Sequence, residues 1–150
     1  MRVDRASRLV AAEPAEVFRA FTDPEQLLRW LPPDGMTARF ERFDPVMGYR
    51  MVLTYDDPPV GGGKATEDAD VADVRRVELA PPHWIVEAVD FPSDDPAYAG
   101  TMTMTWGFEQ RPGGTLVTIE ATDVPPGISP EDHAAGLASS LENLAALFAG

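Results

Sequence analysis

The order of the hydrophobic patterns is the feature of this chain that most constrains its fold. Between residues 101 and 108, large apolar side chains occupy every second position and share one face of a strand: Met102, Met104, Trp106 and Phe108. A Pro-Gly-Gly turn leads into a second alternating segment, 115–121, and from Ser129 onward the apolar spacing becomes helical. This change of period predicts an antiparallel sheet covered by a C-terminal helix.

The rest of the chain predicts a first strand, two short helices and further strands. Segment 3–11 is strand-like, and helices are expected near Pro14 and Pro24, because proline fits a first helical position and the acidic neighbours suit the helix dipole. Alternation predicts further strands over 36–42 and 49–55, a long strand is expected somewhere within 64–79, and 84–91 is another strand after a turn. The closing helix is expected over 130–148, with Leu137, Leu141 and Leu144 in an apolar stripe that also takes in Ala134, Ala138, Ala145 and Phe148. We therefore predict one α+β domain spanning residues 1–150.

The composition excludes several classes of function. The chain has no cysteine, which removes disulfides, thiol nucleophiles and cysteine-bound zinc. Twelve basic residues against 25 acidic ones give a net charge of -13, which repels a phosphate backbone, so nucleic acid is not an expected partner. The N-terminal residues lack a long apolar run, so we expect neither a signal peptide nor a membrane span. We therefore expect a cytoplasmic location.

The motifs for metal or cofactor chemistry are weak. Segment 61–66 is rich in glycine and contains a lysine, but it lacks the first glycine and the magnesium-binding hydroxyl of a phosphate loop. The acidic run 68–73 lacks the glycine and the final glutamate of a calcium loop. His83 and His133 have no second histidine at metal spacing and are expected on the surface. We expect no metal and no cofactor.

Segment 14–25, followed by Leu28 and Trp30, resembles the opening motif of the SRPBCC (START-like) superfamily. The nearest branch is that of the C-terminal domain of the co-chaperone that activates the ninety-kilodalton heat-shock protein ATPase. Further matching positions are Gly48-Tyr49-Arg50, 77–82, Gly113-Gly114-Thr115, and Gly136 with Leu141 and Leu144. The resemblance implies the helix-grip fold: a curved antiparallel sheet around a long C-terminal helix, two short N-terminal helices at one end, and a cavity between sheet and helix.

Two positions depart from the family pattern. Many relatives have a glycine where this chain has Met47, and a tryptophan after the helix glycine where it has Leu137. The first difference predicts a turn with a different backbone. The second predicts a larger cavity.

The apolar stripe of 101–108 has two interpretations, which the sequence leaves open. Large apolar side chains on a sheet either fill a core or line a cavity for an apolar ligand. In the second case we expect a cavity of at least about 300 Å³ between Trp106 and Leu141; if side chains fill that space and leave no such cavity, the stripe is only core. The predicted lining of the cavity is Trp30, Phe40, Met51, Leu53, Met102, Met104, Trp106, Phe108, Leu137 and Leu141.

Glu87 is the one acidic residue that we single out as a candidate for catalysis. One register of strand 84–91 turns Ile85 and Glu87 inward, where the carboxylate would have a raised pKa and would orient a ligand or act as an acid or base. The other register turns Trp84 and Val86 inward and leaves Glu87 in water. We favour the second register, because an unpaired buried glutamate is rare.

Three classes of function remain, in decreasing order of preference. The first is a binding module for a small apolar molecule, without defined catalysis. The second is an enzyme resembling polyketide cyclases and aromatases, for which Glu87 is the only candidate acid or base that the sequence offers. The third is a chaperone-associated protein of the stress response, which would bind its partner through the acidic surface. A homodimer is compatible with each of them.

Overall fold

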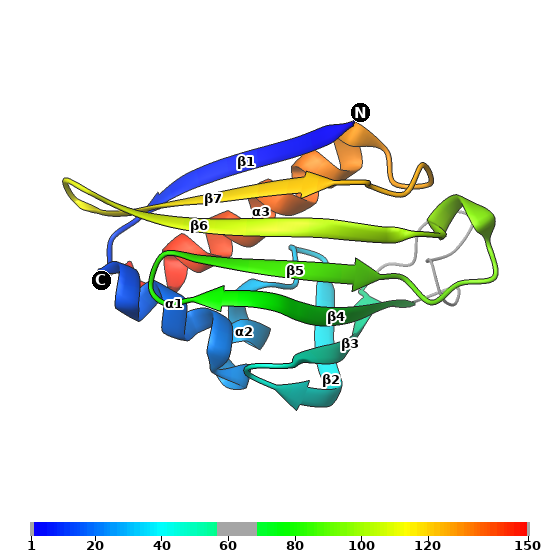
Figure 1. Cartoon of the computed structure of the whole chain (residues 1–150), viewed down its shortest axis with the longest axis horizontal. Helices are drawn as coiled ribbons and strands as arrows, with labels where there is room; N and C mark the ends of the chain where they lie inside the picture. The colour runs from blue at the N-terminus through cyan, green and yellow to red at the C-terminus, as the bar shows by residue number, and fades with distance from the viewer. Residues whose placement is uncertain (1, 57–68, 150) are drawn as a thin grey trace.

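A computed structural model describes residues 2–56 and 69–149 of the chain. The elements follow one another in the order β1 (Val3–Val10), α1 (Pro14–Thr22), α2 (Pro24–Trp30), β2 (Met36–Asp44), β3 (Gly48–Tyr55), β4 (Ala69–Ala80), β5 (Trp84–Asp90), a 3₁₀ turn η1 (Pro96–Tyr98), β6 (Thr101–Arg111), β7 (Gly114–Thr122) and α3 (Pro130–Leu147). Figure 1 shows this arrangement, with α3 behind the sheet and with α1 and α2 at one end. The predicted α+β class and the order of the elements are confirmed.

Within the described residues, seven strands form one antiparallel sheet of order β1-β7-β6-β5-β4-β3-β2. From β2 to β7, each strand pairs with the next one in the chain. β1 then pairs with β7, so β1 and β2 are the two edges. The helices α1 and α2 carry the chain from one edge of the sheet to the other (Figure 1).

The helices begin at the residues that the capping signals predict. The Asp23 carboxylate accepts a hydrogen bond from the backbone N–H of Glu25 at 3.0 Å, and Pro24 follows it at the first helical position. Ser129 caps α3 in the same way by accepting from the N–H of Asp132, also at 3.0 Å. Local chemistry therefore determines where α2 and α3 begin.

Gly48 lets β3 approach β4 closely at the start of their pairing. Its φ is +133°, and an added Cβ would collide with the carbonyl oxygen of Val74. The preceding Met47 is exposed, and its carbonyl accepts a hydrogen bond from the N–H of Arg76 at 3.0 Å. This turn therefore holds the backbone of Arg76, whose side chain enters the core.

Aromatic rings fill the end of the sheet that α1 and α2 cover. We call Phe18, Phe21, Trp30, Trp106 and Phe108 the ring cluster; all five are buried. The centroid of Phe21 lies 4.6 Å from that of Trp30 and 5.0 Å from that of Trp106, in tilted and edge-to-face contacts. The indole N–H of Trp30 donates to the carbonyl of Ala20 at 2.9 Å, so this buried polar atom is satisfied.

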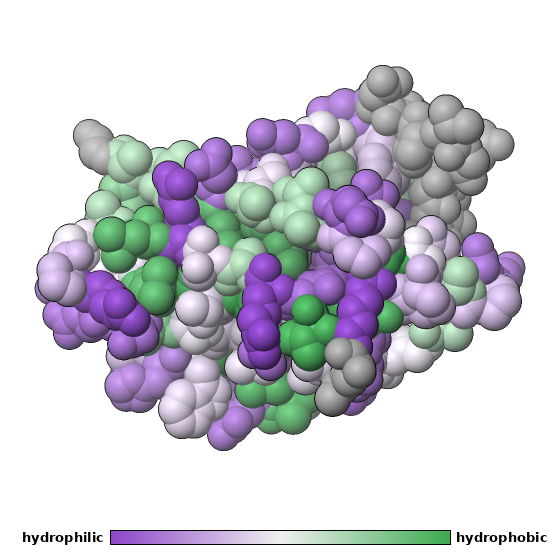
Figure 2. All heavy atoms as spheres, turned by 90° about the horizontal axis from the view of Figure 1, so that it is seen from above, coloured by the Kyte–Doolittle hydropathy of each residue, from purple (hydrophilic) through white to green (hydrophobic). Residues whose placement is uncertain are grey.

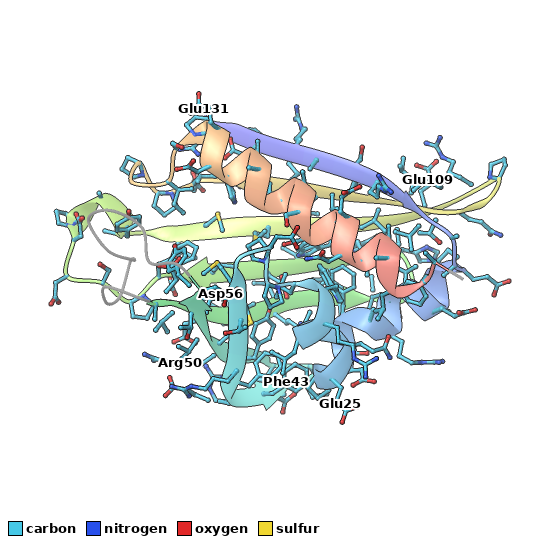
Figure 3. The ribbon with its side chains drawn as sticks, turned by 180° about the vertical axis from the view of Figure 1, so that it is seen from behind. Glu25, Phe43, Arg50, Asp56, Glu109 and Glu131 are labelled. Carbon is cyan, nitrogen blue, oxygen red and sulfur yellow. The ribbon has the colours of Figure 1, made fainter. Side chains whose placement is uncertain are left out.

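Helix α3 lies diagonally across one face of the sheet and packs most closely on β1 and α2 (Figure 3). Its buried side chains are Leu137, Ser140, Leu141 and Leu144. The predicted stripe also contained Ala134 and Ala138, and this part of the prediction is wrong because both are exposed. The helix is rotated so that Ser140, whose hydroxyl donates to the carbonyl of Leu31 at 2.6 Å, faces inward instead. Since α3 lies towards β1, the face of the central strands is less closely covered.

The surface carries the excess of acidic residues. Figure 2 shows hydrophilic side chains spread over the face seen from the β1 side, with smaller hydrophobic areas between them. No helix in the described parts of the chain is long and apolar enough to cross a membrane.

Candidate functional site

A cavity of about 260 Å³ lies between α3 and the face of the sheet formed by β3, β4, β5 and β6. Its lining is mainly apolar and consists of Leu31, Pro33, Met36, Tyr49, Met51, Leu53, Asp70, Ala72, Val74, Glu87, Val89, Phe91, Met102, Met104, Trp106, Ile128, Asp132, His133, Gly136, Leu137 and Ser140. The volume falls somewhat short of the 300 Å³ that we expected, so this prediction of size is wrong. The space suits a ligand smaller than the usual drug-sized molecule.

The structure divides the ten predicted ligand residues into two groups. Six of them line the cavity: Met51, Leu53, Met102, Met104, Trp106 and Leu137. The other four lie elsewhere. Trp30 and Phe108 belong to the ring cluster, Phe40 packs on Phe43 and Tyr49, and Leu141 is buried outside the cavity lining. A role in ligand binding stays a prediction for the six.

Glu87 faces inward, which contradicts the register that we favoured. Its side chain is buried, with 3% of the residue exposed, and it lines the cavity, whereas Trp84 is 42% exposed. The argument against burial assumed an unpaired carboxylate. In the structure the carboxylate is paired with Arg76, which lies directly opposite on β4.

Two donors hold the Glu87 carboxylate. Arg76 Nε donates to Oε2 at 3.3 Å, and the indole N–H of Trp106 donates to Oε1 at 2.9 Å. Burial raises the pKa of Glu87, and the positive charge of Arg76 and the hydrogen bond from Trp106 oppose that rise. The other Arg76 donors bind the carbonyls of Pro45, at 2.6 Å, and of Phe21. Arg76 therefore joins the sheet to α1 and to the β2–β3 turn.

Tyr49 lies beside this pair and presents a hydroxyl to the cavity. Its ring centroid lies 5.6 Å from the guanidinium carbon of Arg76. Burial, followed by the nearby Glu87 charge, raises the pKa of Tyr49 well above its usual value. Among the described residues the Tyr49 hydroxyl makes no hydrogen bond, yet no fully enclosed side-chain polar atom there lacks a partner. The hydroxyl therefore opens on to the cavity that Tyr49 lines.

His133 also lines the cavity, and the prediction that it lies on the surface is wrong. Its Nδ1 lies 2.6 Å from Oδ2 of Asp4, and Arg2 binds both oxygens of the same carboxylate. The hydrogen bond from Arg2 and the contact with His133 hold the pKa of Asp4 below its usual value. Helical spacing contained the signal, because His133 lies four residues before Leu137 on the same face of α3.

The remaining motif residues support no metal site. Asp70 accepts a hydrogen bond from the Tyr55 hydroxyl at 2.6 Å, and Asp73 pairs with Arg42 at 2.8 Å. His83 is exposed, as predicted. The glycine-rich segment 61–66 and Asp68 lie outside the described residues. Within those residues, no group of three or more histidines and carboxylates is placed to hold a metal ion.

Comparison with known proteins connects this geometry to a family. The family described as "Activator of Hsp90 ATPase homolog 1-like protein" (AHSA1) matches residues 11–149. The chain belongs to this family. The AHSA1 family is part of the SRPBCC superfamily, so the resemblance seen in the sequence is confirmed. A comparison with curated proteins found no significant match.

Solved structures of other bacterial proteins share the fold along almost the whole chain. A protein from Chromobacterium violaceum is 30% identical, with a TM-score of 0.83 and coverage of 97% of this chain and 96% of that one. The AHSA1 protein from Silicibacter pomeroyi is 19% identical, with a TM-score of 0.77 and the same coverage of both chains. These similarities confirm the helix-grip fold, while the family match over residues 11–149 shows the AHSA1-like SRPBCC domain.

Proposed function

We propose that this AHSA1-like domain binds a small, mainly apolar molecule in the cavity between α3 and β3–β6. The observation that carries the proposal is the combination of a 260 Å³ space, a lining rich in methionine and leucine, and a few polar groups that converge on it. Methionine side chains adapt their shape to a ligand, and Met51, Met102 and Met104 all line the space.

The space is partly open to solvent, so a small molecule can enter it without disrupting the core. Its volume of about 260 Å³ lies just below the usual range of small-molecule pockets. Its walls are flanked by well-packed elements, the ring cluster at one end and the Leu141 and Leu144 contacts of α3 beside it. The space is therefore a feature that the surrounding packing maintains.

The first experiment looks for a natural occupant and for binding of a simple probe. Native mass spectrometry of the purified protein should detect a co-purified small molecule, and 2-naphthol should bind and change the tryptophan fluorescence, since Trp106 lines the cavity. Trp106→Ala is unsuited to this test, because Trp106 also packs in the ring cluster and donates to Glu87.

A cavity-filling variant locates the binding. Ala72 is small, buried and in the cavity wall, so Ala72→Leu should weaken 2-naphthol binding at least about tenfold by occupying the space, while the fold is kept. Ala134→Leu on the exposed side of α3 is the matched control and should leave binding unchanged. The proposal would be contradicted if no molecule co-purifies with the protein and if 2-naphthol either does not bind or binds equally well to Ala72→Leu.

An enzyme is the second candidate, and the Asp4–His133 pair is the observation that favours it. A carboxylate that holds Nδ1 leaves Nε2 of a neutral imidazole to act as a base, and His133 lines the cavity. A cyclase-like or aromatase-like reaction would use such a base together with Glu87. A ligand recovered from the protein should then be converted by the wild type, but not by His133→Asn, into a product with a different chromatographic retention time, whether or not water is lost on ring closure. An unchanged retention time with both proteins would contradict this second candidate.

A further inference from the structure

We infer that the cavity selects ligands whose polar group is a neutral or cationic hydrogen-bond donor, such as an alcohol, a phenol or an amine, and that it rejects carboxylates. This inference rests on the proposed function and names its ligand class. It follows from the charges and hydrogen-bonding capacity of the described residues that line the cavity.

Glu87 supplies an acceptor at the end of the cavity that adjoins the ring cluster. Its two oxygens take one donor each, Arg76 Nε and the Trp106 indole N–H. An ionised carboxylate accepts at about four lone-pair positions and donates none. The capacity that remains on Glu87, which lines the cavity, is therefore suited to a ligand O–H or N–H.

Tyr49 adds a second polar group close to the first. Its hydroxyl makes no hydrogen bond among the described residues, and burial raises its pKa, so it stays protonated and both donates and accepts. The Tyr49 ring packs against Arg76, the residue that also binds Glu87. A ligand hydroxyl placed there would donate to Glu87 and accept from Tyr49.

The nearby cation does not make the site attractive to anions. The Arg76 side chain is fully buried and does not line the cavity, and its charge is matched by Glu87. Its other described donors bind the carbonyls of Pro45 and Phe21. An anionic ligand would therefore meet the carboxylate of Glu87 and not the guanidinium of Arg76.

The other ionisable groups on the wall strengthen this preference. Asp132 adds a second carboxylate, and His133 is held by Asp4. Among the described residues that line the cavity there is no lysine or arginine. A ligand carboxylate beside Glu87 and Asp132 would bring like charges together, which disfavours binding. Fatty acids and aromatic acids are thus excluded as a class.

The test compares three probes that share one apolar body: 2-naphthol, 2-naphthoate and naphthalene. In calorimetric titrations of the full chain at pH 7.5, 2-naphthol should bind at least about tenfold more tightly than 2-naphthoate. Equal or tighter binding of 2-naphthoate would overturn the inference and leave the proposed apolar site standing. Absence of binding by 2-naphthol and by naphthalene would overturn both.

Two variants test whether Tyr49 and Glu87 cause the preference for 2-naphthol over 2-naphthoate. Tyr49→Phe removes one hydroxyl and should weaken 2-naphthol binding about threefold to tenfold, while naphthalene, which has no polar group, serves as the control and keeps its affinity. Glu87→Gln offers a donor in place of the charge and should bring the affinities of 2-naphthol and 2-naphthoate within about threefold of each other. Unchanged 2-naphthol binding by Tyr49→Phe would overturn the assignment, whether or not Glu87→Gln folds.

Discussion

Two regions on the same face of the sheet differ in how closely they are packed. At one end, α1 and α2 add their aromatic rings to Trp106 and Phe108 and leave no comparable space. Along β3–β6, the wall of the cavity carries Met51, Met102 and Met104. The comparison shows that strands of similar apolar pattern make a core or a cavity according to what covers them.

Strand β6 runs through both regions. Met102 and Met104 line the cavity, Trp106 contacts both the cavity and the ring cluster, and Phe108 belongs to the cluster alone. The core interpretation therefore holds at the Phe108 end of the strand, and at the other end the stripe lines a cavity, where ligand binding stays a proposal. Glu87 and Arg76 lie at the boundary, where Trp106 joins the regions through its hydrogen bond.

Removing the Arg76–Glu87 ion pair at this boundary should have the largest effect on the free energy of unfolding. Arg76→Met leaves Glu87 buried without its cation and should lower the free energy of unfolding by about 3 to 5 kcal/mol at pH 7. Urea denaturation measures the loss. The double variant Arg76→Met, Glu87→Gln removes the uncompensated charge and should recover part of the stability. A loss below about 1 kcal/mol in the single variant would show that the pair does not hold the boundary.

The pH dependence of this variant has a definite sign. Burial raises the pKa of Glu87, and removal of Arg76 takes away the main effect that opposes the rise. Since the folded pKa then lies above the unfolded one, the stability contribution of Glu87 is full below the unfolded pKa and is lost as pH rises through the folded pKa. The stability deficit of Arg76→Met relative to the wild type should therefore shrink as the pH is lowered towards 4.5, the pKa of glutamate in a model peptide. A deficit that stays constant with pH would argue against this origin.

Two leucines one turn apart on α3 sharpen the comparison. Leu141 is buried in the core away from the cavity lining, and Leu141→Ala should cost about 2 to 5 kcal/mol. Leu137 lines the cavity, and Leu137→Ala should cost about 1 kcal/mol less, because a side chain beside empty space has fewer contacts to lose. Denaturant melts of both variants test this order. Equal losses would mean that α3 is packed equally closely at these two successive turns.

The smallest expected effect concerns the Asp4–His133 contact on the cavity wall. Asp4→Asn should lower stability by about 1 kcal/mol at pH 7, because Arg2 and His133 both bind the carboxylate. These contacts lower the folded pKa of Asp4, so its contribution is present above the unfolded value of 3.8 and is lost as pH falls through the folded one. The gap in melting temperature between Asp4→Asn and the wild type should narrow as the pH is lowered from 6 to about 3. A gap that widens on acidification would contradict this linkage.

Local signals in the sequence predicted most of the fold. The caps at Asp23 and Ser129 placed the starts of α2 and α3 correctly, since each acts through a hydrogen bond to a residue two or three positions away. The alternation in 101–108 predicted the inward face of β6. Resemblance to the family added the helix-grip arrangement, which the comparisons confirm.

The candidate site was only partly predictable. Glu87 was assigned to water because its partner, Arg76, lies on another strand and no local pattern pairs them. Arg76 has an inward signal of its own, since Ala72 and Val74 precede it on the same face of β4. The sequence predicted Tyr49 as part of a strand. It did not predict that Tyr49 lies beside the buried Arg76–Glu87 pair, because these residues come from different strands.

The sequence by itself determined the order of the elements, the inward face of β6 and the first residues of α2 and α3, because these depend on neighbours along the chain. Only the tertiary structure decided where α3 crosses the sheet, and hence which end of the β6 stripe is core and which lines a cavity. It also decided the contacts of Asp4 with His133 and of Arg76 with Glu87. The physical reason is that burial, charge pairing and empty space belong to groups brought together from distant parts of the chain, and no local spacing of residues specifies them.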